Sequence, residues 1–364
     1  PPKNESLLGC TSVCRDKTGR LWFSTLDKGI GYVITEENNS LTHLSPYFQS
    51  NNIKTIATDN KQILIGTNSG NLFWLNPTNF SVVKQLHEPN GLPIEALYTS
   101  HNFVYAGSTF LLRVNENKAS IDTIASVSSV KDLAMDKAGN VYVANAFSLM
   151  KVDRTGSKTI IRNKRCQVVE VNENGKVYAA FADGIFEFQN NTQTEIFYQQ
   201  QSIYATSLAL KNDTLFIGSI SNGLIVYFNG NIIQHYNNQN KLLSNCVLKV
   251  KNLNNDIWLL TPSSLDRLVS NNIVHYTGNS NFVFRTIRDF SVCVNKIFLA
   301  SANDLFTLNV IKSKQQQAPS VFIDEILVNK NDSLTYIKNQ FSYQQKNITF
   351  SLSGLSFNEN RRLL

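Results

Sequence analysis

The sequence contains no run of 18 or more apolar residues, so nothing in it predicts a membrane-spanning helix. It also lacks a P-loop, a GxGxxG dinucleotide fingerprint and the GxSxG elbow of serine hydrolases. Only 17% of the 364 residues are charged, and no window of three helical turns repeats apolar residues at helical spacing. These absences disfavour a membrane span, a nucleotide-binding enzyme and a helical domain.

Cysteine is scarce as well. There are five, an odd number, and none lies in a CxxC pair. Cys10 and Cys14 have strand-like neighbours, and four residues along a strand span about 13 Å, too far for a disulfide without a bend. We therefore expect all of them to be small, buried residues, at positions 10, 14, 166, 246 and 293.

The formal net charge of +7 and the pI of about 9.0 raise the question of nucleic-acid binding. The basic residues are scattered, however. The tight groups are Arg162 with Lys164 and Arg165, and Arg361 with Arg362. There is no basic stripe with interleaved aromatic residues, so we expect no nucleic-acid partner.

What the chain does contain is a ten-residue phrase that recurs. DKTGRLWFST begins at Asp16, DKAGNVYVAN at Asp136 and NENGKVYAAF at Asn172. Aligning the large apolar residue of this phrase along the chain gives eight anchors at intervals of 36 to 42 residues: Trp22, Leu64, Tyr105, Tyr142, Tyr178, Phe216, Trp258 and Phe298. A period near 40 without helices is the spacing of four-stranded propeller blades.

Each part of the phrase has a structural interpretation. The leading Asp or Asn side chain can accept hydrogen bonds from backbone N–H groups two residues on, and the glycine three positions later can adopt positive φ. The aromatic anchor buries a large ring between blades. The small residues that follow, such as Gly107 and Gly218, let neighbouring blades approach closely. We interpret the phrase as a turn of a structural repeat and not as a catalytic motif.

A search for chemistry along the chain assigns no catalytic, cofactor-binding or metal-binding residue, and the ligand-binding residues are unknown. The chain has five histidines: His43, His87, His101, His235 and His275. None of them has another histidine, a cysteine or a pair of carboxylates at the spacing of metal ligands. His43, His235 and His275 are expected on fourth, outer strands. A propeller gathers loops around a central depression, and the loops that could line it contain Tyr47 with Phe48, Phe110, Phe147, Phe181 and Asn222. For any one of these aromatic residues, packing between blades is the preferred interpretation.

The first copy of the phrase, Asp16 to Thr25 followed by Gly29-Ile30, resembles the two-component regulator propeller (Reg_prop) repeat. The copies at 136 and 172 resemble it less closely, and the likeness spans about residues 7 to 310. That repeat fills the periplasmic sensor regions of Bacteroidetes hybrid two-component systems and related histidine kinases.

A second feature fits the same family. A polar linker at 312–319 precedes a strand that begins near Pro319, similar to the opening strand of the three-tyrosine (Y_Y_Y) β-sandwich, and residues 347–353 resemble a second strand of it. We expect an all-β chain: a β-propeller of about seven or eight four-stranded blades over 1–311, then residues 320–364 as an incomplete β-sandwich. An eight-bladed ring with residues 1–6 as the last outer strand, and a segment of a longer array, both fit the repeats.

The resemblance implies a periplasmic ligand-sensing ectodomain of an inner-membrane protein. A segment outside the chain would anchor it, a cytoplasmic histidine kinase would follow, and the full-length protein would be a homodimer. The implied ligand is a small molecule or an oligosaccharide released from a polysaccharide, and the fragment itself is not an enzyme. Two alternatives stay open: a secreted propeller lyase or glycosidase with an acid/base pair in the central funnel, and a protein-interaction scaffold.

Overall fold

The computed structural model describes residues 10–15, 21–26, 29–33, 42–43, 52–59, 61–100, 103–115, 119–190, 192–277, 284–310, 321–328, 332–333 and 347–354. Within these ranges the chain is all-β, apart from a 3-10 turn, η2 (Phe284–Thr286). The described residues include no helix with the length and hydropathy of a membrane span. The chain divides into two units, Pro1–Val310 and Ile311–Leu364.

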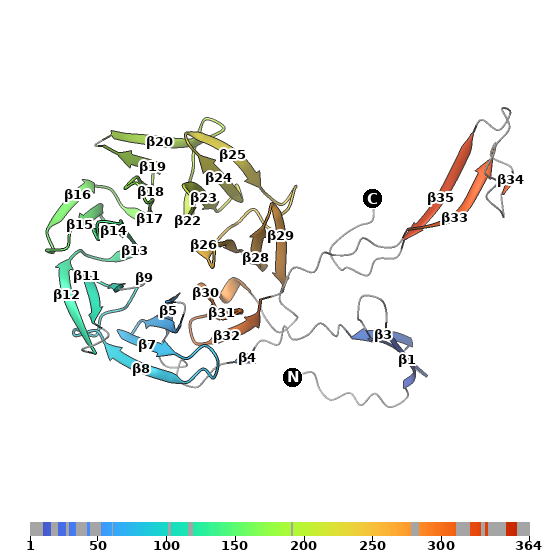
Figure 1. Cartoon of the computed structure of the whole chain (residues 1–364), viewed down its shortest axis with the longest axis horizontal. Helices are drawn as coiled ribbons and strands as arrows, with labels where there is room; N and C mark the ends of the chain where they lie inside the picture. The colour runs from blue at the N-terminus through green and yellow to red at the C-terminus, as the bar shows by residue number, and fades with distance from the viewer. Residues whose placement is uncertain are drawn as a thin grey trace. The chain divides into compact units, whose positions relative to one another are not determined.

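Seven antiparallel sheets of the first unit form a ring, the β-propeller predicted from the repeats (Figure 1). Blade 1 holds β5 (Ile53–Thr58), β6 (Ile63–Thr67), β7 (Asn71–Leu75) and β8 (Val82–His87), and blade 2 holds β9 (Ala96–Ser100), β10 (Phe103–Gly107), β11 (Phe110–Asn115) and β12 (Ser120–Ser126). Blade 3 holds β13 (Val130–Met135), β14 (Val141–Asn145), β15 (Leu149–Val152) and β16 (Lys158–Arg162). In each blade the strands follow one another outward from the axis.

The remaining blades repeat this order. Blade 4 holds β17 (Cys166–Val171), β18 (Val177–Phe181), β19 (Gly184–Gln189), β20 (Thr192–Tyr198) and the short β21 (Gln201–Ser202). Blade 5 holds β22 (Ala205–Lys211), β23 (Thr214–Ser219), β24 (Leu224–Phe228) and β25 (Asn231–Tyr236), and blade 6 holds β26 (Lys249–Leu253), β27 (Asp256–Leu260), β28 (Ser264–Val269) and β29 (Asn272–Thr277). Blade 7 holds β30 (Asp289–Cys293), β31 (Lys296–Ala300), β32 (Leu305–Asn309) and β4 (Thr42–His43).

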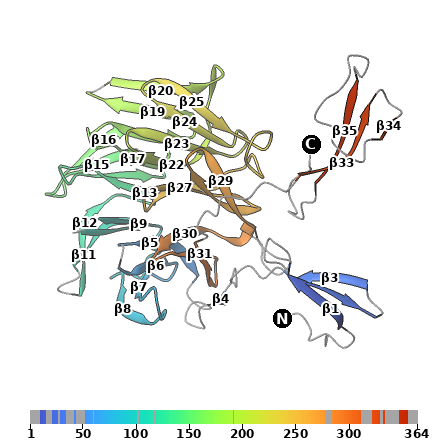
Figure 2. The same cartoon turned by 45° about the vertical axis from the view of Figure 1, so that its right-hand side comes forward.

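The ring closes where blade 7 packs on blade 1. Each innermost strand contacts the next, and β30 contacts β5. The Asp289 carboxylate accepts hydrogen bonds from Thr55 Oγ1 at 3.1 Å and from the Ile56 backbone N–H at 3.0 Å. Phe298 of blade 7 shares an apolar cluster with Phe73 of blade 1. The turned view in Figure 2 shows the same sheets packed face to face.

The outer strand of blade 7 comes from the N-terminal side of the ring. Phe306 pairs with His43 and Thr307 with Thr42, so β4 completes a sheet whose other strands end at residue 309. The eight-bladed ring with an outer strand from residues 1–6 is therefore wrong. Seven sheets form the ring, β4 holds the outer position, and residues 1–6 lie outside the described part.

The first repeat copy forms a three-stranded sheet of its own, made of β1 (Cys10–Arg15), β2 (Leu21–Thr25) and β3 (Gly29–Val33). Its fourth strand, β4, is the one that pairs in blade 7 instead. Cys10 and Cys14 are exposed on β1, contrary to the expected burial, and Val13 between them is exposed as well. Among the described residues these cysteines, Cys246 and the buried Cys166 and Cys293 are all free thiols.

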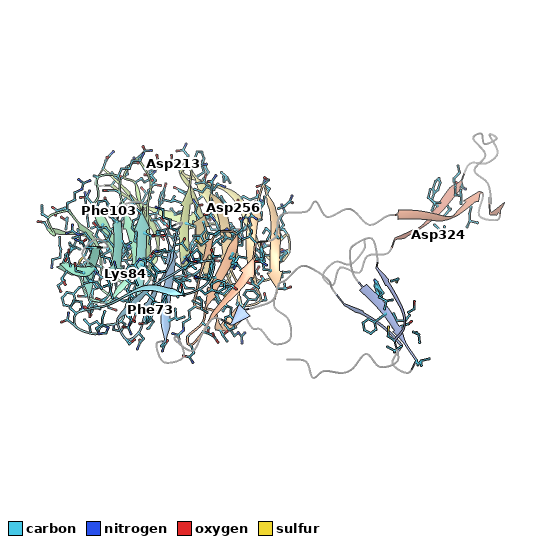
Figure 3. The ribbon with its side chains drawn as sticks, turned by 60° about the horizontal axis from the view of Figure 1, so that its bottom comes forward. Phe73, Lys84, Phe103, Asp213, Asp256 and Asp324 are labelled. Carbon is cyan, nitrogen blue, oxygen red and sulfur yellow. The ribbon has the colours of Figure 1, made fainter. Side chains whose placement is uncertain are left out.

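The predicted anchors form the core between blades. The seven anchors inside the ring are each at most 8% exposed, and side chains fill the space between sheets (Figure 3). The small residues after the anchors have the expected role: a Cβ added to Gly107 would lie 2.4 Å from Val130 Cγ1 of the next blade. Close packing at this contact therefore requires glycine.

The turns confirm the role assigned to the phrase. Asn172 Oδ1 accepts hydrogen bonds from the backbone N–H groups of Asn174 at 3.0 Å and Lys176 at 2.8 Å, and Gly175 has φ of 77°. Asn172 Nδ2 also donates to Asp213 of blade 5 (labelled in Figure 3) at 2.9 Å. Short hairpin turns place asparagine at positive φ, among them Asn212, Asn254 and Asn271. The turn at residues 16–20 lies outside the described residues.

The second unit contains a three-stranded antiparallel sheet, in the order β34 (Asp332–Ser333), β33 (Val321–Val328) and β35 (Ile348–Gly354). β33 and β35 pair from Val321 opposite Gly354 to Val328 opposite Ile348. These are the two strands that the sequence assigned to a β-sandwich. The predicted linker, 312–319, lies outside the described residues.

Candidate functional site

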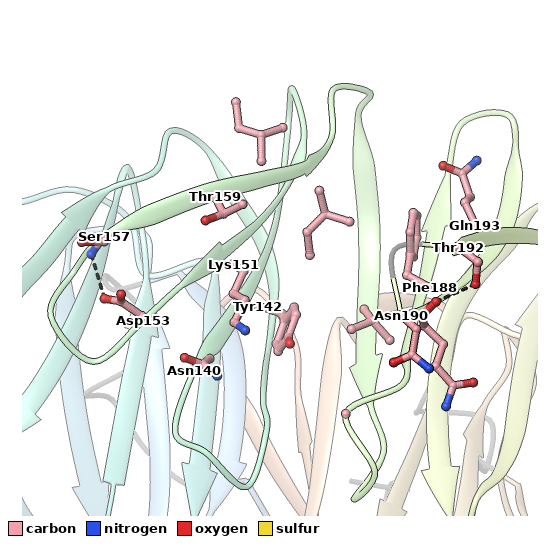
Figure 4. Close-up of a pocket in the computed structure, with 15 residues that line it drawn as sticks. Asn140, Tyr142, Lys151, Asp153, Ser157, Thr159, Phe188, Asn190, Thr192 and Gln193 are labelled. Atoms are coloured by element: carbon pink, nitrogen blue, oxygen red, sulfur yellow. Dashed lines mark hydrogen bonds between the residues drawn. The ribbon is translucent and has the colours of Figure 1, made fainter.

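A groove between blades 3 and 4 is the candidate ligand site. It has a volume of about 720 Å³ and opens at the end of the sheets where the first-to-second and third-to-fourth strand turns lie (Figure 4). Blade 3 contributes Asn140, Tyr142, Lys151, Asp153, Ser157, Thr159, Ile160 and Ile161, and blade 4 contributes Gly175, Val177, Phe188, Gln189, Asn190, Thr192 and Gln193.

Two copies of the repeated phrase build the inner end of this groove. On blade 3, the Asp136 carboxylate accepts hydrogen bonds from the Asn140 backbone N–H at 2.9 Å and from Asn140 Nδ2 at 2.7 Å. On blade 4, Gly175 belongs to the turn pinned by Asn172. An exposed ion pair, Lys137 to Glu173 at 2.7 Å, joins the two turns. The phrase is thus a structural turn that also shapes a cavity.

The apolar surface of the groove comes from both blades. Ile160 on β16 is 56% exposed and Phe188 on β19 is partly buried, while Tyr142, the anchor of blade 3, is 5% exposed. The Tyr142 hydroxyl donates to Asp136 Oδ2 at 3.3 Å. Burial, and then the neighbouring Asp136 carboxylate, raise the pKa of Tyr142 to about 12. The phenol is therefore neutral at physiological pH.

Some polar groups of the groove already form hydrogen bonds within the protein. Asp153 is the single carboxylate among the lining residues, and its Oδ1 accepts bonds from Thr155 N, Thr155 Oγ1 and Ser157 N at 2.6 to 2.9 Å. The hydrogen bond from the Thr155 hydroxyl is the largest cause that lowers the pKa of Asp153. In Figure 4 the amides of Asn190 and Gln193 line the opposite side, beside Phe188.

The lining thus combines aromatic and aliphatic side chains with amides and hydroxyls. Aromatic and aliphatic surfaces stack against the apolar faces of a sugar ring, while amides and hydroxyls reach its hydroxyl groups. A glycosidase needs two carboxylates across the scissile bond, and the described lining supplies one, which caps its own turn. The groove thus offers apolar surface together with hydrogen-bonding groups and one lining carboxylate.

A second set of polar residues surrounds the axis of the ring. The innermost strands place equivalent residues in two tiers, fixed by their pairing with the anchor strands. One tier holds Thr55, Ala96, Asp132, Val168, Ser207, Lys249 and Asp289, and the other holds Ala57, Tyr98, Ala134, Glu170, Ala209, Lys251 and Ser291. We call Asp132, Glu170, Lys249, Lys251 and Asp289 the axial charges.

Asp289 is the carboxylate among the axial charges that forms ion pairs. Its Oδ1 lies 2.9 Å from Lys249 Nζ and 2.6 Å from Lys251 Nζ. Burial alone would raise the pKa of Asp289, but the two ammonium groups and the hydrogen bonds outweigh it and hold that pKa far below its usual range. Lys251 Nζ also donates to the Ile56 carbonyl of β5 at 3.1 Å. These contacts tie blade 6 to blades 7 and 1.

Asp132 and Glu170 are the axial charges without an ion pair among the described contacts. Burial raises the pKa of Asp132 to about 6, although the N–H groups of Val169 and Leu133 and the charges of Lys249 and Lys251 oppose the shift. Burial and Asp132 raise the pKa of Glu170 well above its usual range. Blades 4 and 5 separate β13 from β26 around the ring, and both strands are innermost strands that line its axis.

Sequence reasoning missed both the groove and the axial charges. An alignment of the innermost strands of the blades would have shown this signal. At the axial positions some of these strands carry charged residues, where the equivalent strands of other blades carry alanine, serine or threonine. The groove carries no such signal, because it depends on how two sheets diverge at one end.

The described loops among those proposed from the sequence lie at the opposite ends of the strands from the groove. Phe181 is 3% exposed within the core between blades 3 and 4, and Phe110 packs on a small cluster in blade 2. Phe147 is 64% exposed. Asn222 donates through its backbone N–H to Ser219 Oγ at 2.8 Å. Tyr47 and Phe48 lie outside the described residues.

The histidines on fourth strands take part in local contacts. His235 on β25 lies 3.0 Å from the Tyr198 hydroxyl through Nδ1, and His275 on β29 lies 2.8 Å from Asp266 through Nδ1. His43 lies on the outer strand β4, as expected. His87 Nδ1 lies 3.0 Å from Asn71 Oδ1, and His101 is outside the described residues. The described part contains no group of three or more potential metal ligands.

No protein-family model matches this sequence, and a comparison with curated proteins finds no significant match. Solved structures do match. The extracellular domain of BT3049 from B. thetaiotaomicron, assigned as a hybrid two component system, aligns over 96% of this chain and 50% of its own, with a TM-score of 0.61 and 14% identity. The corresponding domain of BT4673 aligns over 78% of this chain and 41% of its own (TM-score 0.56, 15% identity). The Neurospora crassa Pan2 WD40 domain aligns over 76% of this chain and 97% of its own length, with a TM-score of 0.59 and 12% identity. The chain thus shares the propeller fold, and it spans half or less of the two extracellular domains.

Proposed function

We propose that this chain is part of the extracytoplasmic ligand-sensing region of a membrane-bound two-component sensor. The observation that carries the proposal is the combination of a seven-bladed ring with a following β unit, in a chain that aligns over 96% of its length with one such extracellular domain. A WD40 domain matches the ring over a smaller share of the chain. The resemblance of the repeat to the regulator propeller supports the same assignment.

The groove between blades 3 and 4 is the ligand site in this proposal, and an oligosaccharide is the ligand. Its aromatic surfaces and amides have the chemistry that sugar rings require, and its volume of about 720 Å³ lies within the usual range of ligand pockets. The walls come from two separate blades, so a ligand that spans them would favour one spacing of the blades over another. Signalling requires only that difference in affinity between two arrangements.

The further parts of the sensor follow from the same proposal. Residues 320–364 begin the membrane-proximal sandwich that relays the change, and a segment outside this chain anchors the protein in the inner membrane, with the ring in the periplasm. A homodimer and a cytoplasmic histidine kinase complete it. A protein-interaction scaffold would instead bind a protein and gain no stability from small molecules.

One observation favours a second function. Asp132 and Glu170 are two carboxyl groups on neighbouring innermost strands, both with raised pKa values. A propeller lyase or glycosidase would need two carboxyl groups near the axis, one of them protonated at neutral pH. Release of reducing ends from a polysaccharide, abolished in Asp132→Asn and Glu170→Gln, would support that enzyme.

The test of the sensor proposal is binding without turnover. The ring should gain stability by RT ln(1 + [L]/Kd), about 2.7 kcal/mol at a hundred times Kd, with an oligosaccharide that is recovered unchanged. Phe188→Ala should remove this gain. Phe197→Ala, on the exposed side of the same blade, should keep it. Saturable binding that survives Phe188→Ala would overturn the assignment of the groove, and degradation of the oligosaccharide would favour the enzyme.

A further inference from the structure

The groove contains one cationic side chain, and its position is fixed by the sheet. Lys151 lies on β15, opposite Tyr142 of β14 and Thr159 of β16. Its Nζ lies 5.9 Å from the centroid of the Tyr142 ring. In Figure 4 the side chain points into the space between the blades, above Asn140. The ammonium group thus sits in the groove beside the ring of Tyr142, which is 5% exposed.

Neighbouring lysines already form ion pairs or hydrogen bonds, whereas the contact of Lys151 among the described residues is with the Tyr142 ring. Lys176 lies 2.8 Å from Glu187, and Lys137 is paired with Glu173. Lys158 donates to the Ser126 carbonyl at 3.1 Å. Within the described part of the chain, no carboxylate lies within 4.0 Å of Lys151 Nζ.

The one acid in the groove is engaged elsewhere. Asp153 Oδ1 accepts three hydrogen bonds from Thr155 and Ser157, which hold the carboxylate in its own turn. Turning it toward Lys151 would break those bonds and leave two backbone N–H groups without their acceptor. The ammonium group of Lys151 is therefore available to a ligand.

We propose that the groove selects an oligosaccharide that carries an anionic group, a uronate carboxylate or a sulfate ester, and that Lys151 binds this group. The inference rests on the proposed function of the groove as the ligand site. A neutral sugar would cover Lys151 and strip water from a charge without replacing it, which costs free energy. An anionic group would instead form a charge-assisted hydrogen bond to it in a partly enclosed site. Asn190 and Gln193 remain for the sugar hydroxyls.

The experiment compares matched ligands by isothermal titration calorimetry on the whole chain. The ligands are a uronic-acid tetrasaccharide, the same tetrasaccharide with its carboxyl groups reduced to alcohols, and a sulfated tetrasaccharide. The variants are Lys151→Gln and, as a matched control in the same blade, Lys158→Gln. A titration at 50 and 500 mM NaCl reports the ionic contribution.

We expect at least one of the two anionic tetrasaccharides to bind wild-type protein more tightly than the reduced form, by about tenfold or more. Lys151→Gln should remove that preference and the salt dependence, and Lys158→Gln should keep both. Whichever anionic form binds identifies the carboxylate or the sulfate as the recognised group.

Two results would overturn the inference. Equal binding of the reduced and anionic forms, lost in Phe188→Ala but kept in Lys151→Gln, would leave the groove as a sugar site without charge selection. A preference for anionic forms that Lys151→Gln does not change would place the recognising cation elsewhere. If the wild-type protein bound none of these sugars, that result would instead count against the proposed function itself.

Discussion

Replacing Asp132 with asparagine should stabilise the ring at neutral pH. The folded protein raises the pKa of this carboxyl group from its ordinary 3.8 to about 6, a difference of roughly 2 units, and each unit is worth about 1.4 kcal/mol. Below pH 3.8 the group is protonated in both states and costs nothing. Above pH 6 it is ionised in both, and folding then carries the cost of burying the charge, about 3 kcal/mol.

The asparagine variant should therefore gain about 3 kcal/mol at pH 7 and only about 0.5 kcal/mol at pH 4, where wild-type protein is largely relieved of the same cost. Its amide oxygen can still accept the Val169 N–H that Asp132 accepts at 3.1 Å. The charged groups that face this position are Glu170 on β17, Lys249 and Lys251 on β26 and Asp289 on β30. Removing the charge of Asp132 also relieves Glu170, which acts in the same direction.

Urea denaturation at pH 7 and at pH 4 measures both values, with the buried Trp74 and Trp258 as fluorescent reporters. Asp153→Asn is the control with the opposite sign, because the pKa of Asp153 is lowered in the folded protein. Its substitution should destabilise the protein at pH 7. The reasoning fails if Asp132→Asn destabilises the protein at pH 7, or if its gain is the same at both pH values.

Two further substitutions test the packing of the ring. Asp289→Ala should cost about 3 to 5 kcal/mol in urea denaturation at pH 7, because it leaves Lys249 and Lys251 without their counter-charge; a loss below about 1 kcal/mol would contradict this. Gly107→Ala should cost about 1 to 3 kcal/mol, because the new Cβ would lie 2.4 Å from Val130 Cγ1. Val130→Ala in the same chain should recover part of that loss, and a purely additive double variant would show that the two residues do not clash.

The fold follows from local signals that the sequence displays. The aromatic or aliphatic anchors, the small residues after them and the Asx-pinned turns each have the same physical role in every blade, so their spacing predicts the architecture. Tyr142 and Tyr178 illustrate this, since both were predicted to pack between blades and are buried there.

The site could not be predicted in the same way. The groove lies between the outer strands of blade 3 and those of blade 4. The distance between these strands depends on how the two whole sheets pack against each other. The pairing of Phe306 with His43 depends on two segments 263 residues apart in sequence. Lys151 looks like any exposed strand lysine until its neighbours, each paired with a partner of its own, are known.

The donation of β4 to blade 7 has a consequence for how the chain folds. Every other strand of the ring pairs with a strand near it in sequence, so blades can form one after another as local hairpins, whereas this pairing must close a loop of about 260 residues. Closure is therefore expected as the last and slowest event. Until then the apolar faces of blade 1, with Ile53 and Phe73, and of blade 7, with Phe298 and Leu305, lack each other's cover. An unclosed ring would expose both faces to other chains, so aggregation during refolding should begin at this seam.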